Sequence, residues 1–342
     1  MAKHILVTGG SGFLGSHLVR RLATAGHRVR VIDDNSRGAL RRLADVRDDI
    51  EFVEGDIRDA DAVHDAVEGV DCVAHLAYVN GTEFFYSKPD LVLEVGIRGT
   101  LNVLDACFRH GVSEFVLAST SETYQTPPVV PTPEDVPLTV PDVLNPRYSY
   151  GGGKIACELM AVNFGRSRFE RLMIFRPHNV YGPDMGWEHV LPQFALRAAD
   201  LVRRMPAGPL AFPIQGDGTQ TRAFVHVDDF TDGLMCVLER GAHMSIYHIG
   251  NPEEVAIAEV ARKVVRTFGR EADIIPGEPA RGATVRRCPD ISKLRALGYS
   301  PRIPLDAGLP SLVEWYAAHA DERARAADAP PAVRACAAEE TT

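Results

Sequence analysis

Residues 7–18 read VTGGSGFLGSHL, and this stretch decides the fold. A short apolar run leads into Gly9, Gly12 and Gly15, which are spaced as G-x-x-G-x-x-G, and a helical pattern follows. Glycine permits a tight turn and lets a phosphate approach the backbone, and the helix N-terminus adds N–H groups and partial positive charge. The stretch therefore predicts a strand, a phosphate-binding turn and a helix.

The same alternation continues outward through the first 120 residues. Apolar runs rich in β-branched residues recur at HILVTGG, RVRVIDD, IEFVEGD, DCVAHLA and EFVLAST, with helical periodicity between them. Strands that alternate with helices build a parallel sheet covered on both faces. A proline-rich loop is predicted at 126–146, and helices are predicted at 229–240, at 253–269 and near 305–319. The pattern predicts an α/β fold with a doubly wound parallel sheet.

Composition excludes several classes of partner. The 342 residues carry a formal net charge of −9, which argues against nucleic acid or an anionic membrane as the main partner. Six cysteines form no C-x-x-C pair and twelve histidines show no ligand spacing, so we expect no metal site and no disulfide framework. No apolar run approaches the ~20 residues of a membrane span. Since the N-terminus enters a strand at once, we expect no signal peptide and a cytoplasmic protein.

Acidic residues close the second and third predicted strands. Asp33 and Asp34 lie about 20 residues beyond the glycine turn, where an acid accepts hydrogen bonds from ribose hydroxyls and repels the additional phosphate of NADP. This favours NAD, although Arg37 nearby is a counter-argument. Asp56 ends the third strand and is either a contact to the adenine amino group or a helix N-cap.

A second glycine run stands in YSYGGGK, residues 148–154. Tyr150 and Lys154 are four apart, so on a helix they share a face. A lysine ammonium favours the phenolate of a neighbouring tyrosine, whose free pKa is ~10, and the phenolate is then a base for a ligand hydroxyl. Each glycine between them costs a helix roughly 1 kcal/mol relative to alanine. We hypothesise that these glycines leave room for a bound cofactor and substrate.

The motifs TGGSGFLG, GDIRD, HLAY, ASTSETY, YSYGGGK and RPHNVYGP, in this order, resemble those of the extended short-chain dehydrogenase/reductase family. The resemblance covers about residues 4–317. It implies a Rossmann-type fold with a smaller C-terminal α/β substrate domain, a tightly held NAD, a nucleoside-diphosphate sugar as substrate, and a homodimer. The family's catalytic positions fall on Thr120, Tyr150 and Lys154. Gly96 stands where many members have asparagine, and Gln125 where many have glycine.

The resemblance also implies a division of the chain and a set of contacts. The NAD-binding domain is expected at 1–178 with a return segment near 223–250, the substrate domain at 179–222 and 251–318, and a flexible tail at 319–342. The expected cofactor contacts are Gly9, Gly12, Phe13, Leu14, Gly15, Asp33, Asn35, Asp56, Ile57, Leu76, Ala77, Tyr150, Lys154 and Pro177. The expected substrate contacts are Ser121, Glu122, Asn179, Leu191, Arg222 and Arg287. Arginine forks match diphosphate oxygens.

The reaction is left open among three outcomes that all begin with oxidation at sugar C4. Epimerisation is placed first, because the glycine run is consistent with room for the 4-keto sugar to turn over. Glu122 lies two residues after Thr120 and is the strongest argument against it, since it matches the acid of UDP-glucuronate decarboxylases and half of the acidic pair of 4,6-dehydratases. In those cases Glu122, with Arg287, takes part in the added step. An NAD-binding regulator without activity is the remaining alternative.

Overall fold

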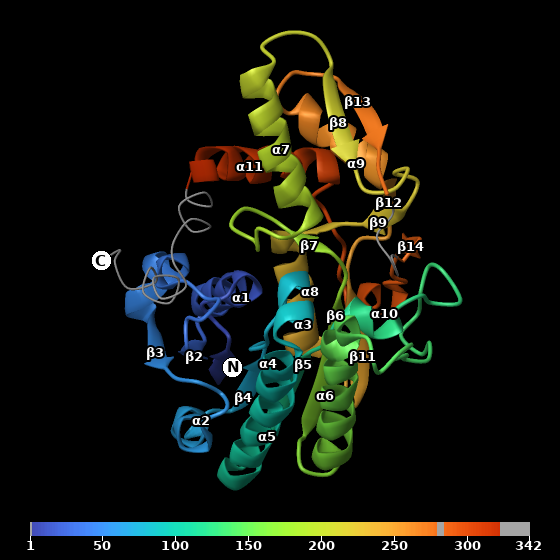
Figure 1. The fold of residues 1–342 in the computed structure, drawn as a ribbon. Helices are drawn as coiled ribbons and strands as arrows, with labels where there is room; N and C mark the ends of the chain where they lie inside the picture. The colour runs from blue at the N-terminus through green and yellow to red at the C-terminus, as the bar shows by residue number, and fades with distance from the viewer. Residues whose placement is uncertain (1, 279–283, 322–342) are drawn as a thin grey trace.

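The computed structural model describes residues 2–278 and 284–321. Seven parallel strands form the central sheet in the order β11-β6-β5-β4-β1-β2-β3 (Figure 1). Their bounds are β1 His4–Thr8, β2 Arg28–Asp33, β3 Ile50–Glu54, β4 Cys72–His75, β5 Glu114–Ala118, β6 Arg171–Pro177 and β11 Ser245–Ile249. The strand order reverses between β1 and β4, and such a switch point is where open α/β sheets bind ligands.

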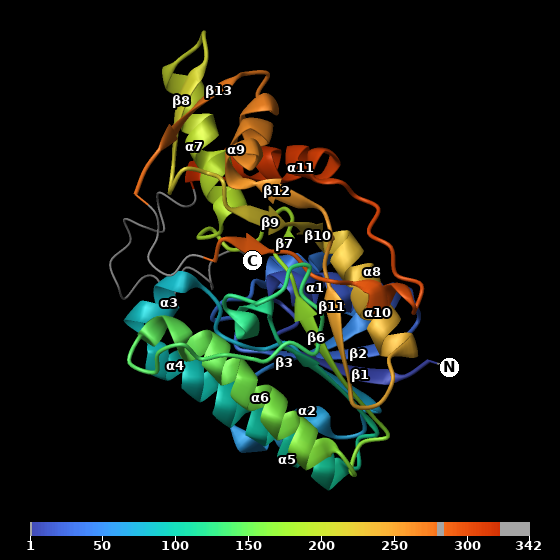
Figure 2. The same cartoon turned by 90° about the vertical axis from the view of Figure 1, so that its right-hand side faces the viewer.

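The two faces of the sheet are covered by different helices (Figure 2). α1 (Phe13–Thr24) and α8 (Val227–Arg240) pack together on one face, and α2 (Ala60–Val67), α5 (Gly99–His110) and α6 (Ser149–Gly165) cover the other. Successive strand residues point to opposite faces. In β1, accordingly, Ile5 and Val7 join the first core while Leu6 joins the second. The run of apolar residues in this strand therefore reflects burial on both sides.

Short elements connect these layers near the carboxyl ends of the strands. They are η1 Leu40–Asp49, α3 Thr82–Ser87, α4 Pro89–Leu93, the π-helical turn η2 Glu94–Arg98, η3 Ser121–Tyr124 and η4 Pro146–Tyr148. Between η3 and η4 the proline-rich segment forms neither helix nor strand, as predicted, apart from a single bridge between Thr132 and Pro289.

A smaller group of elements lies beyond the carboxyl edge of the sheet (Figure 1). Its helices are α7 Val190–Arg204, α9 Ile257–Arg266 and α11 Leu305–Ala318, and its strands are β7 Val180–Tyr181, β8 Leu210–Ile214, β9 Thr221–Ala223, β10 Val225–His226, β12 Glu254–Ala256, β13 Ala272–Pro276 and β14 Arg286–Arg287. The short helix α10 Ser292–Arg295 packs instead against β11 and α8, and its Leu294 belongs to the first core of the sheet. Phe194, Phe212 and Leu312 belong to its apolar core.

The sequence expectations and the structure agree on the α/β fold with a doubly wound parallel sheet. The helix predicted at 253–269 is shorter, because Glu254–Ala256 pairs with β9 as strand β12 before α9 begins at Ile257. The division into domains stays a prediction, and residues 322–342 of the expected tail lie outside the described residues. Over the described residues, no helix combines the length and apolar character needed to span a membrane.

Candidate active site

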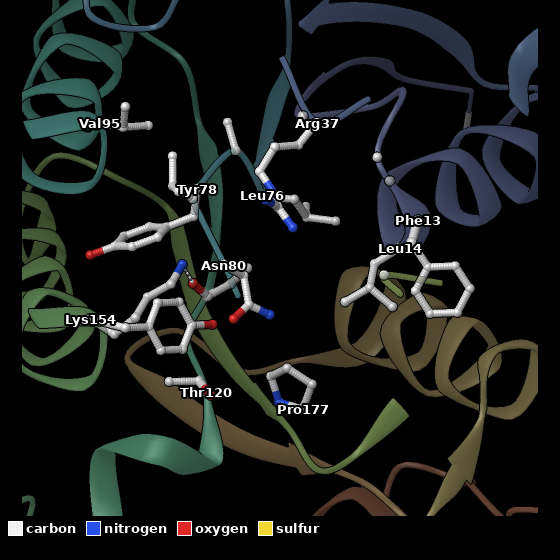
Figure 3. Close-up of a pocket in the computed structure, with 18 of the residues that line it drawn as sticks. Phe13, Leu14, Arg37, Leu76, Tyr78, Asn80, Val95, Thr120, Lys154 and Pro177 are labelled. Carbon is white, nitrogen blue, oxygen red and sulfur yellow. Dashed lines mark hydrogen bonds between the residues drawn. The ribbon is translucent and has the colours of Figure 1, made fainter. Parts of the chain in front are cut away.

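A cavity of about 440 Å³ opens at the carboxyl ends of five strands of the sheet. Gly9 follows β1, Asp33 ends β2, Leu76 follows β4, Ala118 ends β5 and Pro177 ends β6, and all five line the cavity. In Figure 3, Phe13 and Leu14 lie on one side of the cavity, and Tyr78 and Lys154 lie on the opposite side. The cavity therefore joins the glycine turn to the Tyr-x-x-x-Lys pair.

The glycine turn fits a dinucleotide phosphate. Gly9 has a left-handed φ of 72°, and a Cβ on Gly15 would lie 2.1 Å from the carbonyl oxygen of Gly9. Gly12 is the N-cap residue of α1 and lines the cavity. The turn thus brings the N-terminus of a twelve-residue helix to the cavity without side chains in the way, as a diphosphate requires.

Asp33 is buried at the cavity wall and is held by backbone donors. Its carboxylate accepts hydrogen bonds from the N–H of Ser11 at 2.9 Å and of Asn35 at 3.0 Å. Burial raises the pKa of Asp33 above its ordinary value, although these hydrogen bonds oppose the shift. Asn35, predicted as a cofactor contact, is not among the residues that line the cavity, and its side chain accepts a hydrogen bond from the Ser11 hydroxyl.

Asp56 also lines the cavity, and its carboxylate is paired with Arg58 at 2.5 Å. The alternative interpretation of Asp56 as a helix N-cap is wrong, because Asp59 caps α2 through the N–H groups of Asp61 and Ala62. The other predicted cofactor residues, Phe13, Leu14, Ile57, Leu76, Ala77 and Pro177, line the cavity. Which of them contact the cofactor stays a prediction.

Thr120, Tyr150 and Lys154 line the cavity together. Thr120 is the residue before η3, and its hydroxyl accepts a hydrogen bond from the N–H of Glu122 at 3.2 Å. Tyr150 and Lys154 lie one turn apart on α6 and are both buried. Burial raises the pKa of Tyr150 above its ordinary value, and a hydrogen bond with Thr120 acts in the opposite direction. A nearby cation is therefore needed if this phenol is to serve as a base at neutral pH.

Lys154 supplies that cation. Its ammonium donates to the carbonyl oxygen of Ala118 at 2.7 Å and lies 3.9 Å from the centre of the Tyr78 ring. Burial lowers the pKa of Lys154 to about 8, while Cys157 and Glu158 raise it in part. Lys154 is thus charged at neutral pH, as the phenolate of Tyr150 requires.

Glu122 and Arg287 form an ion pair on the cavity wall. They come from η3 and β14, which lie far apart in the sequence. Burial raises the pKa of the Glu122 carboxyl, but Arg287, followed by Arg147 and Arg222, lowers it below its ordinary value. Three guanidinium groups thus surround one carboxylate, and an anionic substrate group is attracted to this wall.

The comparisons with known proteins agree with this geometry. Residues 5–250 match the profile of the NAD dependent epimerase/dehydratase family. The chain belongs to this family. Its sequence is 32% identical over 323 residues to that of dTDP-glucose 4,6-dehydratase of Streptomyces niveus. The alignment covers 91% of this chain and 92% of the relative. The chain is also 33% identical over 312 residues to UDP-glucuronic acid decarboxylase 1 of Arabidopsis thaliana, and this alignment covers 90% of this chain and 68% of the relative.

A solved relative has the same fold. The structure of Thermus thermophilus UDP-glucose 4-epimerase in complex with NAD superposes with a TM-score of 0.79 at 27% identity, covering 92% of this chain and 98% of that one. This family member is therefore an NAD-dependent enzyme of the group that converts nucleotide sugars. The relatives include dehydratases, decarboxylases and epimerases, so the comparisons leave the reaction open.

The remaining predicted substrate residues are distributed unevenly around the site. Ser121 and Asn179 line the cavity, and the Asn179 amide donates to the carbonyl oxygen of Ala223 at 3.0 Å. Arg222 does not line it, although it lies close enough to Glu122 to affect its pKa. Leu191 is 1% exposed in the core of the C-terminal group and does not line the cavity. The roles of these four residues stay predictions.

The second glycine run has a different explanation from the one that its sequence suggests. A Cβ on Gly153 would lie 2.3 Å from the Tyr78 hydroxyl, and one on Gly152 would meet Val140 at 3.4 Å. Neither glycine lines the cavity, whereas Gly151 does. Room for a sugar ring therefore applies at most to Gly151, and Gly153 makes room for a side chain of the protein itself.

Among the residues of the site that sequence reasoning missed are Tyr78, Phe85 and Arg147. Tyr78 and Phe85 contact the Tyr150 ring, with centroids 5.3 Å and 4.9 Å away, and Arg147 lines the cavity. Arg147 had a usable signal, because it lies three residues before Tyr150 at the start of the same helical segment. Tyr78 ends the HLAY motif but was given no role there, and no local pattern marks Phe85, since the fold alone brings both rings to α6.

Proposed function

We propose that this enzyme is a decarboxylase of nucleoside-diphosphate hexuronates, with UDP-glucuronate as the first substrate to test. The observation that carries the proposal is the Glu122–Arg287 pair on the cavity wall, with Arg147 and Arg222 close by. A nucleoside-diphosphate hexuronate carries one carboxylate on its sugar and two phosphates between the sugar and the nucleoside. An excess of guanidinium groups over carboxylates suits both anions.

The first step uses the family's catalytic residues. The glycine turn and Asp33 would hold NAD, which would supply the hydride acceptor for sugar C4. Tyr150 accepts the proton of the C4 hydroxyl, Thr120 holds the same oxygen by a hydrogen bond, and the Lys154 charge favours the phenolate of Tyr150. Phe13 and Leu14 on one side of the cavity and Tyr78 on the other restrict water around these groups (Figure 3).

The second step follows from the ketone at C4. The oxidised sugar is a β-keto acid, so its C5–C6 bond breaks, the electron pair moves onto the C4 oxygen, and carbon dioxide leaves. The Tyr150 hydroxyl and Thr120 donate to the enolate oxygen. A proton from solvent at C5, and at C4 the hydride held by the reduced cofactor together with the proton held by Tyr150, would then give the pentose product. Arg287 lies on the wall that faces this part of the substrate in our proposal.

The state of Glu122 separates decarboxylation from dehydration. A dehydratase needs a protonated acid that gives its proton to the leaving hydroxyl. The arginines lower the pKa of Glu122 below its ordinary value, so this carboxyl is ionised at neutral pH. An ionised Glu122 paired with Arg287 orients the guanidinium and donates no proton. The electrostatics therefore favour decarboxylation over loss of water.

Epimerisation at C4 is the second candidate, and sequence analysis places it first. One observation favours it: Gly151 lines the cavity and places no side chain of its own there. The argument from Gly152 and Gly153 is weaker, because neither lines the cavity and both face protein side chains. The cluster of arginines around Glu122 moves decarboxylation ahead in our proposal.

The test is to incubate the purified protein, without added cofactor, with UDP-glucuronate, UDP-glucose, UDP-N-acetylglucosamine, GDP-mannose and dTDP-glucose. We expect UDP-glucuronate to lose the mass of carbon dioxide, as followed by mass spectrometry and NMR. An isomer of unchanged mass from any of these sugars supports the epimerase instead. Loss of water from a hexose supports the dehydratase. No turnover by protein that retains NAD supports the non-enzymatic regulator.

Arg286 and Arg287 are a matched pair for the control. They are adjacent on β14, but Arg286 is exposed and paired with Glu254 at 2.5 Å, whereas Arg287 faces Glu122 in the cavity. Arg287→Ala is expected to lower kcat/KM for UDP-glucuronate by about 100-fold or more, because it removes a charged partner in a desolvated site. Arg286→Ala is expected to stay within about threefold of the wild type.

We also propose a homodimer, which the family resemblance implies. Leu159 and Phe164 on α6 support it, because they are 59% and 48% exposed on the outer face of the molecule. Light scattering of the wild type and of Leu159→Lys tests this, with a shift toward the monomer expected for the variant.

A further inference from the structure

The ring of Tyr78 lies against the ammonium of the catalytic lysine. Tyr78 follows β4 in the sequence and lines the cavity (Figure 3). The ammonium of Lys154 is 3.9 Å from the centre of its ring, and the ring meets Tyr150 edge-on, with centroids 5.3 Å apart and planes at 85°. Phe85 stacks on the Tyr150 ring at 4.9 Å and 12°. Both members of the Tyr-x-x-x-Lys pair therefore rest on aromatic rings that come from outside their own helix.

Two glycines from different helical segments make room for this ring. A Cβ on Gly96, in η2, would lie 2.3 Å from Cζ and Oη of Tyr78 and 2.4 Å from Cε2. A Cβ on Gly153, in α6, would lie 2.3 Å from Oη and 3.6 Å from Cζ. Real Cβ atoms essentially never approach other atoms this closely, so Tyr78 cannot keep its place beside a side chain at either position. One aromatic ring thus accounts for two separate glycines.

The ring, and not its hydroxyl, makes the contacts that matter. Among the described residues, the buried Tyr78 hydroxyl has no hydrogen-bond partner. A buried hydroxyl without a hydrogen-bond partner lowers the stability of the folded protein, so the hydroxyl does not explain why a tyrosine stands at position 78. The face of the ring, by contrast, offers the negative quadrupole that attracts a cation. Lys154 donates a single hydrogen bond among the described residues, to Ala118, so the ring is its other close partner.

We propose that Tyr78 is a positioning residue whose ring holds the Lys154 ammonium, in its charged form, beside Tyr150, and that Gly96 and Gly153 are glycine because a side chain at either position would displace that ring. This inference rests on the proposed role of Tyr150 and Lys154 as base and cation. It does not depend on which reaction follows the oxidation of the sugar.

A double-mutant cycle tests the packing half of the proposal by thermal unfolding of the NAD-loaded protein. Gly153→Ala is expected to lower the Tm by about 4 °C or more. In a Tyr78→Phe background the closest atom of the ring is Cζ, so at least half of that loss is expected to return. Gly96→Ala is expected to show no such recovery, since its Cβ meets Cζ and Cε2, which phenylalanine retains. If Gly153→Ala lowers the Tm equally in the wild-type and Tyr78→Phe backgrounds, the packing half of the proposal is wrong.

Ionisation of Tyr150 tests the electrostatic half without any substrate. The chain has nine tyrosines, so the phenolate absorbance of each protein is taken as a difference from the same protein carrying Tyr150→Phe. Tyr78→Phe keeps the ring face and is expected to leave the midpoint unchanged. Tyr78→Leu removes it and is expected to raise the midpoint by about one pH unit. An unchanged midpoint in Tyr78→Leu overturns the proposal.

The other groups around the pair stay the same in these variants. Thr120, Glu122 and Cys157 act on Tyr150, while Cys157 and Glu158 act on Lys154, which in turn lowers the pKa of His75. If Tyr78→Leu fails to fold, Tyr78→Met, which also lacks a ring face, replaces it in the titration. Because neither readout uses a sugar nucleotide, failure of the decarboxylase proposal and failure of this one are distinguishable.

Discussion

The chain carries two glycine runs near its pocket, Gly9 to Gly15 and Gly151 to Gly153. In the first run the constraint at Gly15 comes from neighbours in the sequence, because a Cβ there would meet the carbonyl oxygen of Gly9 at 2.1 Å, although Gly9 and Gly10 face the distant residues Ala77 and Val31. In the second run the constraint at Gly153 comes from Tyr78, on a different strand connection. The difference shows that a local glycine motif can be interpreted from sequence alone, whereas an isolated glycine depends on the fold.

The largest effect is expected where the constraint is local. Gly15→Ala forces its new methyl group onto the backbone of the glycine turn, and backbone cannot rotate away as a side chain can. We expect a loss of about 3 kcal/mol or more of stability and loss of bound NAD. Thermal unfolding and the NAD content of the purified protein measure both. A Gly15→Ala protein that retained NAD would contradict our account of the turn.

The sequence predicted the first run and its surroundings well for the same reason. The five strands up to β5, the glycine turn and Asp33 depend on local periodicity and on short-range backbone geometry. Tyr150 and Lys154 were predictable because an i, i+4 spacing fixes their common face. The role of Gly153, the Glu122–Arg287 pair and the ring of Tyr78 against Lys154 depend on contacts between distant segments, which no periodicity in one sequence encodes.

The second-largest effect concerns the charge beside the second run. Lys154 is buried, and its pKa falls from 10.5 to about 8. Below pH 8 the lysine is protonated in the folded and unfolded states, so the full cost of burying the charge, about 3 kcal/mol, opposes folding. Above pH 8 the folded protein releases this proton first, and the cost disappears as the pH approaches 10.5.

Lys154→Met is therefore expected to abolish activity and yet to stabilise the NAD-free protein at pH 7 by about 1–3 kcal/mol, because the lost hydrogen bond to Ala118 offsets part of the gain. Denaturant unfolding at several pH values checks this. The difference from the wild type must shrink between pH 8 and pH 10.5. A Lys154→Met variant that is less stable than the wild type at pH 7 contradicts the conclusion that burial of the Lys154 charge opposes folding.

An intermediate effect is expected at Gly151, where the constraint is soft. A Cβ there would meet the Gln125 amide nitrogen at 2.8 Å and the Glu122 carbonyl oxygen at 3.2 Å. The Gln125 side chain can move, but it then gives up its hydrogen bond to that carbonyl, which is 2.6 Å long. We expect Gly151→Ala to cost about 1 kcal/mol and to raise KM for the sugar nucleotide more than it lowers kcat. Unchanged kinetics would remove Gly151 from the substrate wall.

The smallest effect, and the one with opposite sign, is expected at Gly152. A Cβ there would meet only Val140, at 3.4 and 4.0 Å, which is ordinary van der Waals contact, and Gly152 does not line the cavity. Alanine is the better helix former by roughly 1 kcal/mol, so Gly152→Ala should stabilise the protein by up to that amount and leave kcat/KM unchanged. Thermal unfolding and steady-state kinetics decide it. Activity lost in Gly152→Ala with stability intact would restore the hypothesis that this glycine makes room for the sugar, and would make the whole second run a feature of the substrate site.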